Sequence, residues 1–253
     1  MTVPKNFGTF HVVSLIIIIL SCATIIIFRH KIPKQVIPSL ILYVGIVMIL
    51  FEIYKQLVIS YDPITDSWKY KWYVFPFQFC STPEYITILA FICHKLNFKR
   101  LYNASVSFLA TYGLIAGTVV LIIPSTVFCS IIGINLQTVI HHGLMVILAI
   151  TLLASGSVKT NASSMKGAIT VFVPLLVIAL IMNTVYGNGR EFDMFYLSPE
   201  SQHVLPILRD IFGHGFPPYP LYLIGYIVLF TSGAALVLYI THALTKDIKA
   251  KTK

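Results

Sequence analysis

The chain has 253 residues, of which 57% are hydrophobic and only 11% are charged, whereas about a quarter of the residues of a soluble domain carry charge. This composition excludes a water-soluble globular protein and predicts a polytopic membrane protein. The net charge of +9 does not indicate nucleic-acid binding. Most Lys and Arg residues lie in short loops beside apolar runs, where they indicate how the chain is oriented across the membrane. The four cysteines lack CxxC or Cys/His metal spacing and no glycine-rich phosphate loop is present, so neither a metal nor another cofactor is expected.

Seven apolar segments are long enough to cross about 30 Å of hydrocarbon as helices. They are expected at about residues 9–28, 36–59, 73–94, 102–123, 135–155, 168–186 and 219–244. No soluble domain is left over between them. We therefore predict an all-α fold, a polytopic membrane helix bundle of about seven transmembrane helices that forms a single transmembrane helical domain over residues 1–253.

Positive charges are distributed unequally between the two sets of connections. The first, third and fifth connections and the C-terminal tail hold 12 Lys and Arg residues, and the opposite side holds five. Excess positive charge stays cytoplasmic. The C-terminus is therefore predicted to face the cytoplasm and the N-terminus the outside of a cell membrane that the chain crosses several times.

Several polar side chains fall within these apolar segments, where ionisable groups are costly and are functional-site candidates by default. On the predicted topology they share the outer half of the bilayer: Glu52, Lys55, Cys80, Glu84, His141, His142, Asn183 and Tyr186. This agreement in depth predicts one polar pocket in the outer leaflet half. The connection from Gly187 to Pro218, which contains Asp193, lies on the same side and is either a lid over this pocket or a surface loop.

Cys80 lies between Pro76 and Pro83, and irregular backbone at membrane depth is tolerated only where protein or a water-lined cavity satisfies it. Most membrane cysteines are small packing residues. A thiol beside an imidazole, however, can act as a nucleophile whose proton the imidazole accepts. His142 is the favoured base, because Gly143 beside it permits close approach.

The remaining polar residues have two interpretations each. Glu84 or Glu52 could orient the imidazole, and the Glu52–Lys55 pair could bind a lipid head group or be a structural ion pair on one helix face. His141 points about 100° away from His142 on the helix. Asn183 could donate a hydrogen bond to an oxyanion or hold two helices together.

Six short motifs occur in a fixed order: Glu52-x-x-Lys55, Pro76-Phe-Gln-Phe-Cys80, His142-Gly143-Leu, Asn183 before a glycine-containing turn, Asp193-Met-Phe-Tyr-Leu197 and Pro218-Tyr-Pro-Leu-Tyr222. Together they resemble the YwaF-like integral membrane proteins. That family also includes a eukaryotic transmembrane acyltransferase that transfers fatty acyl chains onto ether phospholipids. The resemblance implies that Cys80 is an acyl-accepting cysteine and His142 its partner histidine. The chain departs from the family pattern at Gln78, where the family has His, and at Asp193, where it has Asn.

These observations predict a membrane enzyme that transfers or hydrolyses a lipid acyl group. Cys80 and His142 are the predicted catalytic residues, and the predicted substrate-binding residues are Glu52, Lys55, Glu84, His141, Asn183, Tyr186 and Asp193. The expected partners are membrane lipids, including a phospholipid or acyl substrate. Two alternatives remain: a small transporter or solute-binding membrane component, whose polar residues would continue to the inner face, and a non-catalytic protein whose polar cluster is structural.

Overall fold

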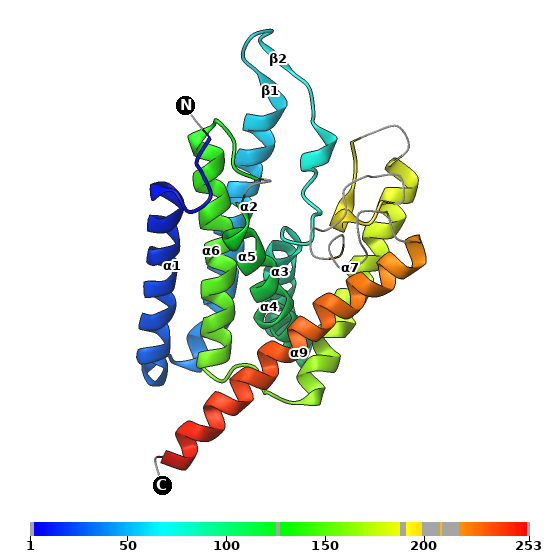
Figure 1. Ribbon diagram of the computed structural model, residues 1–253. Coiled ribbons are helices and arrows are strands. Elements are labelled where there is room, and N and C mark those ends of the chain that lie inside the picture. Colours follow the sequence, from blue (N-terminus) through cyan, green and yellow to red (C-terminus); the bar gives the residue numbers. More distant parts are fainter. Residues whose placement is uncertain (1–2, 125–126, 188–190, 199–207, 209–217, 252–253) are drawn as a thin grey trace.

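The computed structural model describes residues 3–124, 127–187, 191–198, 208 and 218–251, and the side chains of these residues up to 246. Within this part of the chain, six helices are long and apolar enough to cross a membrane. They are α1 (Thr9–Ile27), α2 (Ile37–Ser60), α4 (Lys99–Ala110) continued by α5 (Tyr112–Ile122), α6 (Ile132–Ala154), α7 (Ala162–Tyr186) and α9 (Tyr219–Lys251). The predicted all-α membrane helix bundle is therefore confirmed (Figure 1).

The third apolar segment, predicted over residues 73–94 with an interruption at Pro76 and Pro83, contains a helix shorter than the segment. A 3₁₀ turn, η3 (Trp72–Val74), is followed by irregular backbone, and α3 (Thr82–Lys95) has only 14 residues. Proline explains the difference, because it lacks a backbone N–H and disrupts a helix interior but is accepted in a first turn. Pro76 precedes the helix, and Pro83 stands in the first turn of α3.

Short elements complete the connections. Residues 29–36 form two 3₁₀ turns, η1 (Arg29–Lys31) and η2 (Lys34–Val36), and a small antiparallel hairpin of β1 (Tyr61–Asp62) and β2 (Ser67–Trp68) follows α2. α1 begins and α9 ends at opposite ends of the bundle (Figure 1), as an odd number of crossings requires. Which end faces the cytoplasm stays a prediction.

α3 lies inside the bundle and packs against α2 and α4, while α6 contacts α1, α2 and α5. Aromatic side chains fill the centre. The rings of Tyr112 and Phe172 stack with centroids 4.5 Å apart, and those of Phe79 and Phe230 lie 4.6 Å apart. Because α3 is central, the irregular stretch that leads into it is also held within the bundle, and this stretch carries Cys80.

Gly117 sets how closely α5 approaches α6. A Cβ atom at this position would lie 2.9 Å from the backbone oxygen of His142 and 3.1 Å from Cβ of Met145. Gly113, four residues earlier on the same helix, has ordinary van der Waals space, with the nearest atom 3.8 Å away. The close contact of α5 with the site-bearing turn of α6 therefore depends on Gly117.

We expect Gly117→Ala to lower the free energy of unfolding by about 1–2 kcal/mol, within the usual cost of overpacking, because helix backbone must shift. Gly113→Ala is the matched control and should leave it unchanged or raise it by up to about 1 kcal/mol, since alanine is the better helix former. Unfolding by a denaturing detergent in mixed micelles measures both. Equal effects of the two substitutions would contradict this account of the α5–α6 contact.

Candidate functional site

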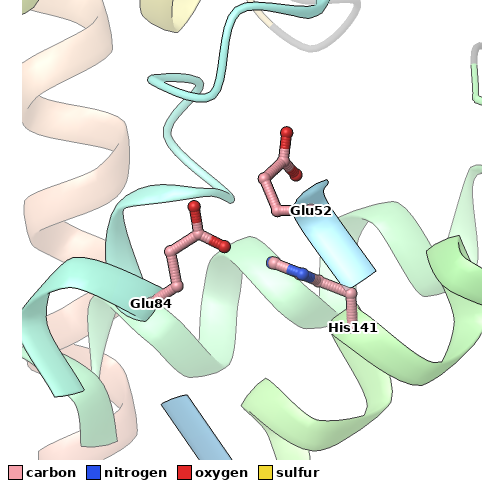
Figure 2. A group of neighbouring side chains, drawn as sticks. All are labelled: Glu52, Glu84 and His141. Carbon is pink, nitrogen blue, oxygen red and sulfur yellow. The ribbon is translucent and has the colours of Figure 1, made fainter. Parts of the chain in front are cut away.

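Two carboxylates and one imidazole converge from three helices (Figure 2). Glu52 comes from α2, Glu84 from the first turn of α3 and His141 from α6, and one donor atom of each lies within 4.8 Å of the others. All three residues are buried, at 4%, 1% and 2% exposure. The first turn of a helix is a favourable place for a carboxylate, because the helix dipole is positive there. Three of the predicted site residues therefore form a direct cluster.

Lys55 supplies the opposite charge to this cluster. Its Nζ atom lies 2.8 Å from Oε2 of Glu52, one turn earlier on α2. The other carboxylate oxygen of Glu52 accepts a hydrogen bond from Nε2 of Gln56 at 2.7 Å. Gln56 in turn donates to the carbonyl of Val74 and accepts from the hydroxyl of Tyr70. The ion pair is thereby tied to the stretch that leads toward Cys80.

The hydrogen bonds of the two histidines indicate their tautomers. Nε2 of His141 lies 3.3 Å from the carbonyl oxygen of Cys80, and Nδ1 of His142 lies 2.7 Å from that of Thr138. A carbonyl can only accept, so these nitrogens carry the protons. The remaining nitrogens, Nδ1 of His141 and Nε2 of His142, are acceptors, and both are buried without a hydrogen-bond partner among the described residues, as is Oε2 of Glu84.

Two carboxylates and an imidazole also form a donor set that suits a divalent cation. Lys55 already places a positive charge on Glu52, and a metal ion would have to bind against the repulsion of that ammonium group. Lys55 therefore already balances part of the negative charge of the cluster, and we still predict that this site holds no metal ion.

Cys80 belongs to the irregular stretch before α3 and is half-buried, and its thiol is free. The side chain of Gln78 fixes this stretch. Its Nε2 donates to the carbonyl of Asp193 at 2.7 Å, and its Oε1 accepts from the backbone N–H of Phe195 at 3.1 Å. Where the resembling family has a histidine, this chain thus has an amide that joins the Cys80 segment to residues 193–195.

Residues 192–198 are packed into the bundle around η5 (Met194–Tyr196). The side chains of Met194, Phe195 and Leu197 are fully buried, so this described part of the long connection is neither an open lid nor a surface loop. Phe195 and Tyr196 have φ angles of 61° and 57°, a left-handed conformation that is uncommon for residues other than glycine. Residues keep such a conformation where the surrounding contacts hold them in it.

Asn183 is the principal anchor of this segment. Its Nδ2 donates to the carbonyl of Met194 at 2.9 Å, and its Oδ1 accepts from the Met194 N–H at 2.7 Å. Asp193 accepts from the N–H of Ser198 at 2.7 Å. Both predicted site residues therefore bond to the backbone of this segment. Tyr186 is 47% exposed, and its ring packs against that of Phe192, outside the charged cluster.

We expect Asn183→Leu to lower the free energy of unfolding by about 2–4 kcal/mol. The orphaned N–H of Met194 costs about 1–3 kcal/mol and the weakened carbonyl roughly another 1 kcal/mol. Thr184→Leu is the control, because Thr184 is exposed and bonds only within its own helix. Faster hydrogen exchange across residues 192–198 in the Asn183 variant alone is the expected companion result, and unchanged exchange there would refute the anchoring role.

A comparison with protein-family models decides the family. The model of the TMEM164 family matches residues 6–239. The chain belongs to the TMEM164 family. This is a family of transmembrane proteins, in agreement with the six spanning helices. No curated protein and no solved structure matches the chain. The likeness of this TMEM164-family protein to YwaF-like proteins and to an acyltransferase stays a resemblance.

The structure of the TMEM164-family protein brings only part of the predicted site together. Glu52, Lys55, Glu84 and His141 form one cluster, and His141 links it to the Cys80 backbone. His142 lies beside His141, with ring centroids 5.3 Å apart, and its bonded nitrogen turns to its own helix.

Two glutamines of this site, Gln56 and Gln78, were not among the predicted site residues. Gln56 follows Glu52 by four residues, the spacing of neighbours on a helix surface, and this signal could have placed it beside the carboxylate. Gln78 differs from the histidine of the resembling family. Nothing in the sequence indicated that its amide would bond to residues 193 and 195.

Proposed function

We propose that this protein transfers a fatty acyl group of a membrane lipid, in the cell membrane, through a thioester on Cys80. The observation that carries the proposal is the group of buried acceptor atoms beside the Cys80 segment. Oε2 of Glu84, Nδ1 of His141 and Nε2 of His142 have no hydrogen-bond partner among the described residues. Buried polar atoms are almost always paired, so this group indicates a ligand that donates hydrogen bonds.

The only atoms that satisfy acceptors of this kind are the hydrogens of donor groups, such as the hydroxyl groups of a lipid or of water. A lysophospholipid has a free glycerol hydroxyl, and its deprotonation is the step that makes it an acyl acceptor. Water in the same position would lead to hydrolysis. The arrangement therefore supports a site for an attacking hydroxyl group next to the cysteine.

In the first half-reaction, a histidine removes the thiol proton, and the Cys80 sulfur attacks the ester carbonyl of the donor lipid. The carbon–oxygen bond of the ester breaks, the leaving alcohol takes the proton from the imidazolium, and the acyl chain remains as a thioester. In the second, the acceptor hydroxyl gives its proton to the histidine and attacks the thioester. The sulfur leaves and is protonated again, so the enzyme returns to its starting state.

We assign the base to His141, although His142 was the base that the sequence favoured. His141 contacts the Cys80 residue at 3.3 Å, and a ring nitrogen of His141 lies within 4.8 Å of a carboxylate oxygen from both Glu52 and Glu84. His141 is therefore better supported as an acceptor of the thiol proton, and no described contact tests the role of His142.

The transporter alternative would need polar residues that continue through the bundle. Along α4 and α5, the polar residues Asn103 and Ser107 are followed by two buried aromatic residues, Phe108 and Tyr112. Gly113 comes next, and a Cβ atom there would lie 4.0 Å from Pro83 in the first turn of α3. Tyr112 stacks on Phe172 of α7. An aromatic layer thus stands between the cluster and the other end of the bundle, and this favours an enzyme over a pathway.

The proposal is tested by trapping the thioester. Purified protein in micelles is incubated with a phospholipid that carries a labelled acyl chain, and the reaction is quenched in acid. We expect label on Cys80, identified by peptide mass spectrometry, that neutral hydroxylamine removes, as it does from thioesters. Cys22→Ala, which removes a half-buried thiol of α1, should leave the labelling intact. Lipid turnover without any label on Cys80 would refute the covalent mechanism.

A further inference from the structure

A second polar region lies where α6 ends and α7 begins, at the end of the bundle that the charge distribution assigns to the cytoplasm (Figure 1). It is a cavity of about 760 Å³ between the first turns of α4, the α6–α7 connection and the first turns of α7. This volume is comparable to that of small-molecule sites, which span about 300–1,000 Å³. The aromatic layer around Tyr112 and Phe172 separates it from the charged cluster.

Two cations line this cavity, Arg100 from α4 and Lys159 from the α6–α7 connection. Neither forms an ion pair with any residue that the structure describes. No Asp or Glu lines the cavity, and none occurs in residues 95–110 or 155–170 of the sequence. An open cavity lined by charges of one sign attracts ligands of the opposite sign, so the ligand expected here is an anion.

The hydrogen-bond donors identify the kind of anion. Ser107 is only 3% exposed and lines the cavity, and its hydroxyl bonds to no described residue. Ser163 and Ser164 line it from the first turn of α7, a 25-residue helix that begins after its N-cap residue Asn161. Asn161 caps the N–H of Ser164, whereas the N–H groups of Ala162 and Ser163 form no bond with a described residue. These two N–H groups and the positive end of the helix dipole favour phosphate at this turn. Guanidinium, ammonium, hydroxyl and backbone donors together suit the several oxygens of a phosphate group.

We propose that this cavity binds the phosphate group of a ligand that approaches from the cytoplasmic side. Two sources share this chemistry, the head group of an anionic phospholipid and a soluble phosphate compound. A smaller, mainly apolar cavity of about 310 Å³ adjoins the first at Asn161 and is lined by Met165, Leu238 and Tyr239 between α7 and α9. It offers a place for hydrocarbon beside the phosphate site. The inference does not depend on Cys80.

The test measures binding to the purified full-length protein in maltoside micelles, which contain no phosphate. One arm titrates phosphatidic acid into the micelles and follows the bound lipid by native mass spectrometry. The other titrates inorganic pyrophosphate and follows binding by calorimetry. Saturable binding of phosphatidic acid alone identifies a lipid head group, and comparable binding of pyrophosphate identifies a soluble phosphate ligand. If neither probe binds, the proposal is overturned.

The double variant Arg100→Gln/Lys159→Gln should weaken binding about tenfold or more, because two charge-assisted contacts to phosphate are lost. Lys99→Gln/Lys166→Gln is the matched control. It removes the same charge from the first turns of α4 and α7, at positions that do not line the cavity. It should weaken binding less than about threefold, as expected for screened surface charges. Equal weakening by both pairs would overturn the proposal in favour of diffuse attraction.

Ser163→Asp separates binding from folding. A carboxylate in the first turn of α7 favours the helix, so the unfolding midpoint should stay the same or rise. The same charge in the cavity repels phosphate, and binding should weaken about tenfold or more, as like charges placed close together predict. Unchanged binding of the preferred probe to this variant would overturn the proposed phosphate site.

Discussion

Replacement of Cys80 by serine or alanine is expected to lower lipid acyl transfer on the order of a thousandfold or more, because removal of a nucleophile abolishes the covalent route. Serine keeps the size of the side chain but lacks the acidity of a thiol, so it does not form the attacking anion as readily. The measurement is transfer of a labelled acyl chain from phospholipid to a lysophospholipid by purified protein. Because Cys80 is half-buried and makes no side-chain hydrogen bond with a described residue, the unfolding midpoint should change little.

Two histidine variants accompany this experiment. His141→Asn should lower the rate by about a hundredfold to ten-thousandfold, the usual contribution of a general base. His142→Asn should lower it less, because the bonded nitrogen of His142 is directed to Thr138 on its own helix. The reverse order would return the role of base to His142. Full activity of the Cys80→Ala variant would end the mechanism altogether.

Replacement of Lys55 by methionine is expected to lower the free energy of unfolding by about 3–5 kcal/mol, the cost of leaving a buried charge without its partner. Lys55 is the partner of Glu52, whose side chain is 5% exposed. A second buried carboxylate, Glu84, lies within 4.8 Å, so loss of the ammonium also leaves two acidic groups side by side. Unfolding in mixed micelles at neutral pH measures the change.

The double variant Glu52→Gln/Lys55→Met should recover most of this stability, because the glutamine oxygen still accepts from Gln56 and no charge is left unpaired. Lys69→Met is the control for removing a positive charge on an exposed side chain and should change the free energy by less than about 0.5 kcal/mol. If the single Lys55 variant is as stable as the double variant, the ion pair does not compensate the burial of Glu52.

Hydropathy and charge were sufficient for the membrane fold, because a bilayer requires about 20 apolar residues per helix. At the third segment they did not determine where the helix begins. The apolar run starts near residue 73, the two prolines indicated an interruption, and α3 begins only at Thr82. Periodicity and topology likewise placed Glu52, Glu84 and His141 at a similar depth, and the structure brings them together. The direction in which each side chain points depends on packing between helices, which depth does not determine.

The part of the site that sequence did not predict consists of side chains bonded to backbone. The sequence suggested that Asn183 could donate a hydrogen bond to an oxyanion, and it indicated no role for Gln78. In the structure they hold Met194 and Phe195. The bond between Gln78 and Phe195 joins residues more than 100 positions apart, and neither it nor the bonds of Asn183 follow a spacing rule. The left-handed φ angles of Phe195 and Tyr196 are equally invisible in a sequence where no glycine marks them.

The shortness of α3 has a consequence for biogenesis. Fourteen residues of helix extend about 21 Å, less than the hydrocarbon thickness of about 30 Å. The stretch ahead of them has its polar partners on α2, on α6 and in residues 193–195. This crossing is therefore a poor substrate for insertion by itself and is completed only after later helices have entered the bilayer. Cys80 lies on this stretch, so we expect truncated nascent chains to lack the assembled cluster of Glu52, Glu84 and His141.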